Sequence, residues 1–192
     1  MQVTTWTLEQ TTRPATPPGP LPADVRVDRA LRISPEYARF LYGLVGGPWR
    51  WVDRLGWDRA RWEQELTVPG TEHLVAYGDG QPLGYAHLQP QVHAAGSQVE
   101  LRYFGLVETA IGRGLGRALL ERAVAAAWTL PERHHLPPVR RVWLHTCSLD
   151  GPSALANYRA RGFVVLDERV TDEDVPSAPL GSWVSTGGPG AG

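Results

Sequence analysis

The sequence contains no lysine: all 19 basic side chains are arginine. Their charge is balanced by 20 acidic residues. A GC-rich genome that favours Arg codons explains this better than a function does. The net charge of -1 provides no basic field for nucleic acid or an anionic membrane. The single cysteine, Cys147, excludes an internal disulfide and fits a reducing cytosol. No secretory signal and no apolar run of about 18 residues is present, so we expect a soluble cytoplasmic protein.

The two ends of the chain differ in composition from its middle. Residues 1–23 contain a strand-like piece (VTTWTL) and a connector with five prolines, which oppose helix and sheet alike. Residues 172–192 are rich in Pro, Gly and Ser, with a candidate last strand near 182–185 and a GGPGAG end predicted to be disordered. The length suits one domain, which we place at residues 24–171.

The middle of the chain alternates predicted strands and helices. Ser34-Pro35 predicts the start of a helix to about Val45, and Asp58 caps a second helix through Leu66. Asp79-Gly80 predicts a hairpin turn. Further helices are predicted over 114–128 and 152–161, and strands over 24–28, 73–77, 83–88, 98–107, 141–147 and 163–166. This order predicts an α/β fold, with helices on both sides of a mixed sheet.

The segment from Val99 to Leu120 combines a strand, a glycine-rich loop and a helix. Gly112, Gly114 and Gly116 let the backbone approach a bulky group, and the unpaired amides at the start of a helix bind anions. The alternative is a glycine loop that only packs tightly on a neighbour. The loop lacks the GK[ST] of a P-loop, which binds nucleoside triphosphates. Its glycines are spaced GxGxG and not GxGxxG, so it does not fit a dinucleotide-binding loop either.

Two motifs resemble those of the GNAT N-acetyltransferases. Ile111 to Gly116 is similar to the acetyl-CoA motif [Q/R]xxGxG/A, with Ile111 where Gln or Arg is usual. Ala154 to Phe163 fits the family's later pattern A-x-x-[L/N]-Y-x-x-x-G-F. The resemblance covers roughly residues 24–170. It implies a GNAT fold, with a mixed, mostly antiparallel central sheet of six to seven strands flanked by helices on both faces. It also implies direct transfer of an acetyl group from acetyl-CoA to a primary amine.

The resemblance further implies which residues bind the cofactor. A backbone amide at Leu106 or a neighbour would polarise the thioester, and Val107 would pair with the pantetheine arm in an opening between two diverging strands. Asn157 would help to position CoA. The pyrophosphate would lie on the loop amides, with added charge from its arginines; these residues are Gly112, Arg113, Gly114, Leu115, Gly116 and Arg117.

The resemblance also suggests the catalytic groups. Tyr158 would protonate the leaving thiolate, since a phenol and a thiolate have comparable basicity; the alternative is a core tyrosine. Glu100 is the leading general base, and an exposed strand carboxylate is the equal alternative. Glu108 and His145 are the other candidate bases, and both are also candidate substrate-binding residues. Cys147 is interpreted as an inert thiol.

The resemblance implies that the first two helices and their connection wall the acceptor side. Trp49 and Trp51 stand there among charged residues, and aromatic walls suit an amine-bearing small molecule. The alternative is that these tryptophans only pack the helices onto the sheet. No residue spacing predicts a metal site. A protein acceptor, a longer acyl group and an acyl-CoA sensor without turnover stay open. Dimers are frequent in the family, so a homodimer is also left open.

Overall fold

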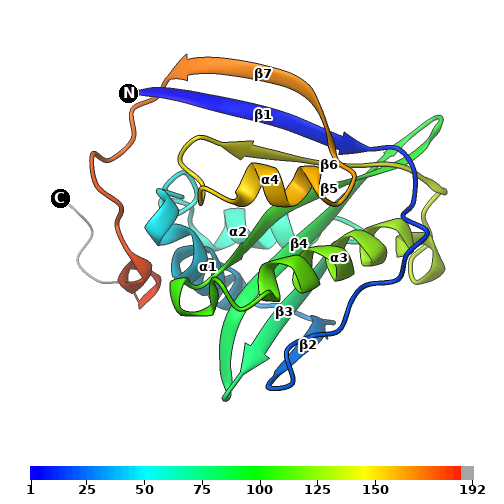
Figure 1. Cartoon of the computed structure of the whole chain (residues 1–192), viewed down its shortest axis with the longest axis horizontal. Coiled ribbons are helices and arrows are strands. Elements are labelled where there is room, and N and C mark those ends of the chain that lie inside the picture. The colour runs from blue at the N-terminus through cyan, green and yellow to red at the C-terminus, as the bar shows by residue number, and fades with distance from the viewer. Residues whose placement is uncertain (187–192) are drawn as a thin grey trace.

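The computed structural model describes residues 1–186, so the GGPGAG end lies outside the described residues (Figure 1). Seven strands form one sheet in the order β2-β3-β4-β5-β6-β1-β7. Every neighbouring pair is antiparallel except β5–β6. The strands are β1 (Gln2–Gln10), β2 (Val25–Ala30), β3 (Glu72–Gly78), β4 (Gln81–His93), β5 (Gly96–Leu106), β6 (Val139–Cys147) and β7 (Val164–Asp172).

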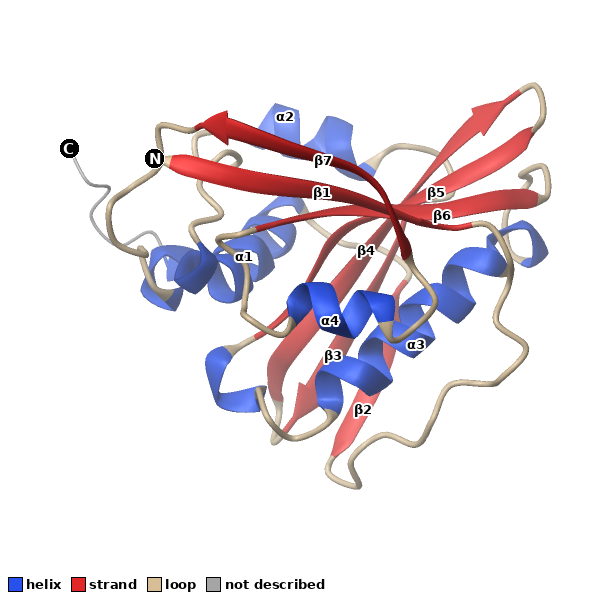
Figure 2. Cartoon of the chain, turned by 45° about the horizontal axis from the view of Figure 1, so that its top comes forward, coloured by secondary structure: helices blue, strands red, loops and turns tan. Residues whose placement is uncertain are grey.

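Helices cover both faces of this sheet, which confirms the predicted fold class. On one side lie α1 (Pro35–Gly46) and α2 (Arg59–Leu66), and on the other α3 (Leu115–Trp128) and α4 (Ala154–Arg159) (Figures 1 and 2). Short 3-10 turns are η1 (Gly47–Trp49), η2 (Glu108–Ala110), η3 (Leu130–Glu132) and η4 (Ser182–Thr186). The Ser34 hydroxyl accepts from the Tyr37 amide, and Asp58 accepts from the Arg61 amide, as predicted for the two caps.

Strand β1 is an integral strand of the sheet, although the sequence placed it before the domain. It pairs with β6 on one side and β7 on the other, and it carries the buried side chains of Val3 and Leu8. Residues 11–24 then cross the outside of α3 to reach β2 (Figure 1). We call this segment the strap.

The two halves of the sheet separate between β5 and β6. These strands pair only from Ser97–Glu100 to Val139–Trp143, after which β6 continues along β1. Figure 2 shows β1, β6 and β7 diverging from β3 and β4 toward one side. The divergence leaves the second half of β5 with an open edge, the feature that the GNAT resemblance implied.

The candidate last strand near 182–185 is wrong. The chain there forms η4, preceded by Gly181 at φ +72, and the Gly181 amide donates to the Gly47 carbonyl at 3.2 Å. The segment therefore packs at the end of α1, away from both sheet edges. Arg50 secures it by donating to the carbonyls of Pro176 and Ser177.

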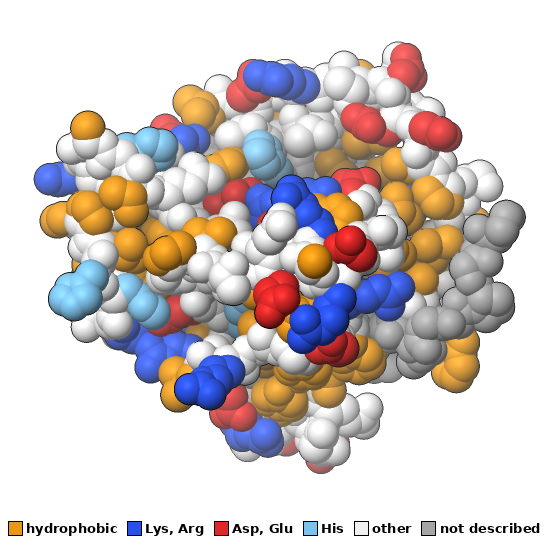
Figure 3. All heavy atoms as spheres, turned by 180° about the vertical axis from the view of Figure 1, so that it is seen from behind, with side chains coloured by type: hydrophobic (Ala, Val, Ile, Leu, Met, Phe, Trp, Pro, Cys, Tyr) orange, Lys and Arg blue, Asp and Glu red, His pale blue; other side chains and the backbone are white. Residues whose placement is uncertain are grey.

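The face formed by α1 and α2 carries charges of both signs. Figure 3 views this face and shows arginine side chains next to acidic ones, with no broad patch of one sign. Arg59, for example, pairs with Glu36 and Glu63. Among residues 1–186, no helix has both the length and the apolar character needed to cross a membrane.

Candidate active site

The glycine loop forms an open cradle at the start of α3. Gly112 and Gly114 have φ of +84 and +75, and an added Cβ at either position would touch nothing within 4 Å. Glycine is therefore required by backbone conformation rather than by space. Gly114 caps α3 without any side-chain acceptor, so the first amides of the helix keep their donors for an anion.

The backbone groups at the end of β5 differ in whether they are free to bind a ligand in the gap between β5 and β6. The Val107 amide donates to the Leu83 carbonyl at 3.0 Å, and the Val107 carbonyl accepts from the Ala110 amide. Val107 thus has both backbone groups paired within the chain, and its proposed pairing with pantetheine has no support in this geometry. Because an antiparallel ladder alternates, the N–H and C=O of Leu106 point away from β4, to the side where β6 has diverged.

Tyr158 is held in the core beside this opening. It is 6% exposed, and its ring lies edge-on to Phe104 and Phe163. Gly162, at φ +83, ends α4 and returns the chain so that Phe163 is buried. Burial, and then the nearby Asp150 carboxylate, raise the pKa of Tyr158 well above its usual value, so the phenol keeps its proton.

Two cavities meet at Tyr158. The first, which we call the glycine-loop groove, has about 540 Å³ and runs from Ile111–Gly116 along the start of α4. The second, the inner pocket, has about 270 Å³ and lies between the diverging β5 and β6. Five residues line both cavities and form their junction: Trp49, Trp51, Phe104, Asp150 and Tyr158.

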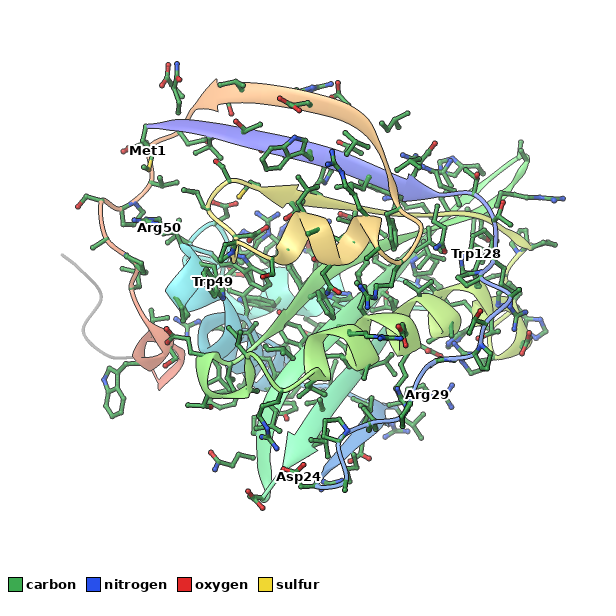
Figure 4. The ribbon with its side chains drawn as sticks, viewed as in Figure 1. Met1, Asp24, Arg29, Trp49, Arg50 and Trp128 are labelled. Atoms are coloured by element: carbon green, nitrogen blue, oxygen red, sulfur yellow. The ribbon has the colours of Figure 1, made fainter. Side chains whose placement is uncertain are left out.

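Both predicted acceptor-side tryptophans belong to this junction. The Trp49 ring lies 3.4 Å from the Cβ position of Gly151, next to the start of α4 (Figure 4). The Trp51 ring contacts the rings of Tyr42 and Tyr103 at a tilt of 42°, with centroids 5.5 and 6.0 Å away. Trp51 thus packs against the core, and both tryptophans line the two cavities.

Asp150 is a junction residue that sequence reasoning missed. Its Oδ2 accepts from the Thr146 hydroxyl at 2.7 Å and from the Cys147 amide at 3.0 Å, which fixes the carboxylate. Its Oδ1 accepts from Trp51 Nε1 at the longer distance of 3.3 Å. In the sequence, Asp150-Gly151-Pro152 has the composition of a turn, and that was the only signal it carried.

Glu100 lies apart from the two cavities. It is 7% exposed, its Oε2 accepts from Arg102 Nη1 at 3.2 Å, and Arg102 also pairs with Glu65. Glu100 lines neither the groove nor the inner pocket. Of the other candidate bases, Glu108 is exposed at η2, outside both cavities, whereas His145 lines the inner pocket.

The remaining cofactor candidates divide into three groups. Asn157 and Arg117 line the glycine-loop groove. Arg113 turns outward and pairs with Asp24 of the strap. The Leu115 side chain is 1% exposed in the core, so it offers only its amide.

The inner pocket also contains Cys147. Burial, followed by the carboxylates of Asp150 and Asp53, raises the pKa of the Cys147 thiol, which disfavours the nucleophilic thiolate. Within residues 1–186, no three His, Cys, Asp or Glu side chains gather as a metal-ligand set.

A comparison with protein-family models identifies the class of this protein. The model of the acetyltransferase (GNAT) family matches residues 33–163, well over half of the chain. The chain therefore belongs to the GNAT acetyltransferase family.

Solved structures share the fold at low sequence identity. A GCN5-related N-acetyltransferase from Sphaerobacter thermophilus is 18% identical with a TM-score of 0.59, over 88% of this chain and 50% of that one. One from Kribbella flavida is 17% identical with a TM-score of 0.53, over 87% and 56%. A tandem GNAT protein of the clavulanic acid pathway is 16% identical with a TM-score of 0.62, over 89% and 55%.

This chain thus spans about half the length of those three proteins. A comparison with curated proteins finds no match.

Proposed function

We propose that the protein transfers an acetyl group from acetyl-CoA to a primary amine of a small molecule. The observation that carries this proposal is the junction of the two cavities at Tyr158. The glycine-loop groove suits a long phosphate-bearing donor, because free amides and Arg117 lie at one end and the open edge of β5 at the other. The inner pocket, at about 270 Å³, suits a small acceptor rather than a protein surface.

Acetyl-CoA would supply the activated acetyl thioester. The chain would supply a donor for the carbonyl oxygen, through the outward-facing amide of Leu106, which stabilises charge as it develops. Tyr158 would give its proton to sulfur as the carbon–sulfur bond breaks and the carbon–nitrogen bond forms. The phenol is protonated at neutral pH, because burial raises its pKa.

Asp150 would receive the proton that the amine must lose. Its fixed carboxylate faces the junction, whereas the Glu100 carboxylate is bound to Arg102 outside it. Asp150 would also attract the ammonium form of the acceptor, beside the aromatic faces of Trp49 and Trp51. We propose Asp150 in place of Glu100 for proton removal.

The test is a screen of small amines for release of free CoA thiol, with Tyr158→Phe as the diagnostic variant. This variant should lower kcat by about 100-fold or more and leave the affinity for acetyl-CoA within about 3-fold of wild type. Tyr37→Phe is the matched control, since Tyr37 bonds to Tyr77 and lines neither cavity. Its kcat should not change.

Two other results would contradict the proposal in different ways. Tight binding of acetyl-CoA without thiol release for any amine would identify an acyl-CoA-binding protein without turnover. Absence of acetyl-CoA binding to the wild-type chain would exclude the donor itself.

A further inference from the structure

The inner pocket carries charges of both signs. Three arginines and three acidic residues line it, so their formal charges cancel. The pocket therefore has no net field that would favour a polycation or a polyanion. Which ligand it binds depends on which of these charges already have partners within the protein. The charged lining residues are Arg50, Arg54, Arg102, Asp53, Asp150 and Glu173.

Two of the three arginines use their donors in structural bonds. Arg50 Nε and Nη2 donate to the carbonyls of residues 176–177, at 2.9 and 3.0 Å. Arg102 is bound between two carboxylates, because its Nη1 donates to Glu100 and its Nε and Nη2 donate to Glu65. Both side chains are thus held by the fold.

Arg54 is the third arginine, and its outer nitrogens are unpaired. Its Nε donates to the Tyr103 hydroxyl at 3.2 Å, and its guanidinium lies 4.7 Å from the centre of the Trp57 ring. In the described part of the chain, neither Nη1 nor Nη2 has a hydrogen-bond partner. Asp53 Oδ2 lies 3.8 Å from Nη1, but the Asp53 side chain is 73% exposed, so solvent screens this pair.

The guanidinium of Arg54 is suited to a carboxylate. Its side chain is 29% exposed, and Tyr103 and Trp57 fix its orientation. Nη1 and Nη2 together form a planar fork, which matches the two oxygens of a carboxylate. A ligand carboxylate would therefore pair with a cation that is already in place.

Asp150 and Arg54 lie at different ends of the inner pocket. Asp150 lines both cavities, whereas Arg54 lines the inner pocket alone. Two aromatic side chains connect them. Trp51 bonds to Asp150, and its ring contacts the ring of Tyr103. Tyr103 in turn bonds to Arg54. The anionic end of the pocket is thus next to the glycine-loop groove, and the cationic end is away from it.

The space between these two ends is mostly apolar and small. Tyr42, Leu101 and Phe104 line it, and Val175 of the C-terminal segment lines it as well. Figure 4 labels Arg50 next to this segment, which Arg50 secures. At about 270 Å³ the pocket suits a single small molecule with an apolar body, and not a segment of polypeptide.

We propose that the acceptor is a free amino acid, with its amine at Asp150 and its carboxylate on Arg54. This inference rests on the proposed function and names its substrate class. The amine nitrogen bonds to the acetyl carbon as the carbon–sulfur bond breaks. The amine loses a proton to Asp150, and the thiolate gains one from Tyr158. The products are an N-acetyl amino acid and CoA, and proton exchange with solvent restores both side chains.

The experiment is a screen of free amino acids with acetyl-CoA and the full chain, followed by release of CoA thiol. The common L-amino acids, β-alanine and 4-aminobutyrate are tested. Each one that is acetylated is then compared with its own carboxamide, which keeps the amine and loses the negative charge. Arg54→Gln is the diagnostic variant, and kcat/KM is measured for acid and amide with both enzymes.

Arg54→Gln should lower kcat/KM for the acid by about 10- to 100-fold, because it removes a charge-assisted pair. Its kcat/KM for the amide should stay within about 3-fold of wild type, which also shows that the variant is folded. Each substrate is compared between two enzymes, so the different basicities of the two amines cancel. Arg54→Lys keeps the charge without the fork and should lose less activity on the acid than Arg54→Gln.

Arg61→Gln is the matched control. The Arg61 guanidinium lies 5.0 Å from the centre of the same Trp57 ring, but Arg61 is exposed and lines neither cavity. This variant should keep wild-type activity on acid and amide.

Three results would overturn the amino-acid inference and leave the acetyltransferase proposal intact. They are acetylation of other amines but of no amino acid, equal activity of wild type and Arg54→Gln on the acids, and equal losses on acid and amide in that variant. Absence of thiol release by wild type with every amine would overturn both.

Discussion

Replacement of His73 by phenylalanine should make the protein less sensitive to acid. His73 in β3 faces His87 in β4, with ring centroids 4.1 Å apart and exposures of 3% and 1%. Burial lowers the pKa of His73 from its usual 6.5 to about 4. The pKa of His87 is also lowered, by burial first and then by His73 and Arg102. Both rings are therefore neutral in the folded protein at pH 7.

The sign and size of the effect follow from proton linkage. Above pH 6.5 neither state binds a proton at His73, and the stability is fully present. Between pH 6.5 and 4 the unfolded chain binds a proton at this histidine that the folded chain excludes. The free energy of unfolding therefore decreases as the pH is lowered through this range. A shift of the pKa from 6.5 to about 4 corresponds to a loss of about 2.5 kcal/mol at pH 4.5 from this side chain alone.

The assay is urea unfolding followed by tryptophan fluorescence at pH 7.5 and pH 4.5. Each protein has its own difference in unfolding free energy between the two pH values, and that difference should be smaller in His73→Phe by about 2.5 kcal/mol. Carboxylates titrate in both proteins, so their contribution cancels. His93→Phe is the control, because His93 is exposed on β4 and its substitution should leave the pH dependence unchanged.

An equal pH dependence in wild type and His73→Phe would refute this reasoning. It would mean that water reaches the ring and that the histidine is protonated without unfolding. An equal change in the unfolding free energy of the variant at both pH values would not test the linkage argument. Exchange of the ring alone alters packing, and with it the unfolding free energy, by about 1 kcal/mol.

Local signals in the sequence predicted local structure well. Asp79 and Gly80 both have positive φ, as the hairpin turn between β3 and β4 requires. Gly162 ends α4 as predicted, and Ser34 and Asp58 cap their helices. Each of these turns, helix ends and caps depends on a few residues that are neighbours in the chain. The sequence pattern is therefore enough to predict it.

The position of Glu100 depended on a non-local feature. In β5, Leu101 pairs with Leu88 and Tyr103 with His87, which leaves Arg102 as the extra residue of a β-bulge. A one-residue bulge reverses which face the following side chains occupy. Glu100 therefore lies on the opposite face of the sheet from Phe104. Simple alternation along the strand cannot reveal such a bulge.

The position of β1 also escaped the sequence pattern. Its nearest strand in sequence is β2, but its partners β6 and β7 are more than 120 residues away. The apolar residues Val3 and Leu8, which are buried, predict a strand but do not indicate which strands it pairs with. Pairing with a distant strand is decided only when the sheet assembles. The course of the strap follows from this placement, because β1 ends beside the last turn of α3 and the chain then crosses α3 to reach β2.

Two further substitutions test the loop and the core. Gly114→Val places a branched side chain at φ +75 and should weaken acetyl-CoA binding by about 10-fold or more, whereas Gly56→Val, with open space and no positive φ, should not. Phe163→Ala should lower the unfolding free energy by about 3 to 5 kcal/mol, because the ring is 2% exposed and packs against Tyr158. The neighbouring Val164→Ala, at a residue 60% exposed, should cost below about 1 kcal/mol in the same urea titration. Similar losses for both variants would mean that Phe163 does not anchor α4, and that the position of Tyr158 must be maintained by other contacts.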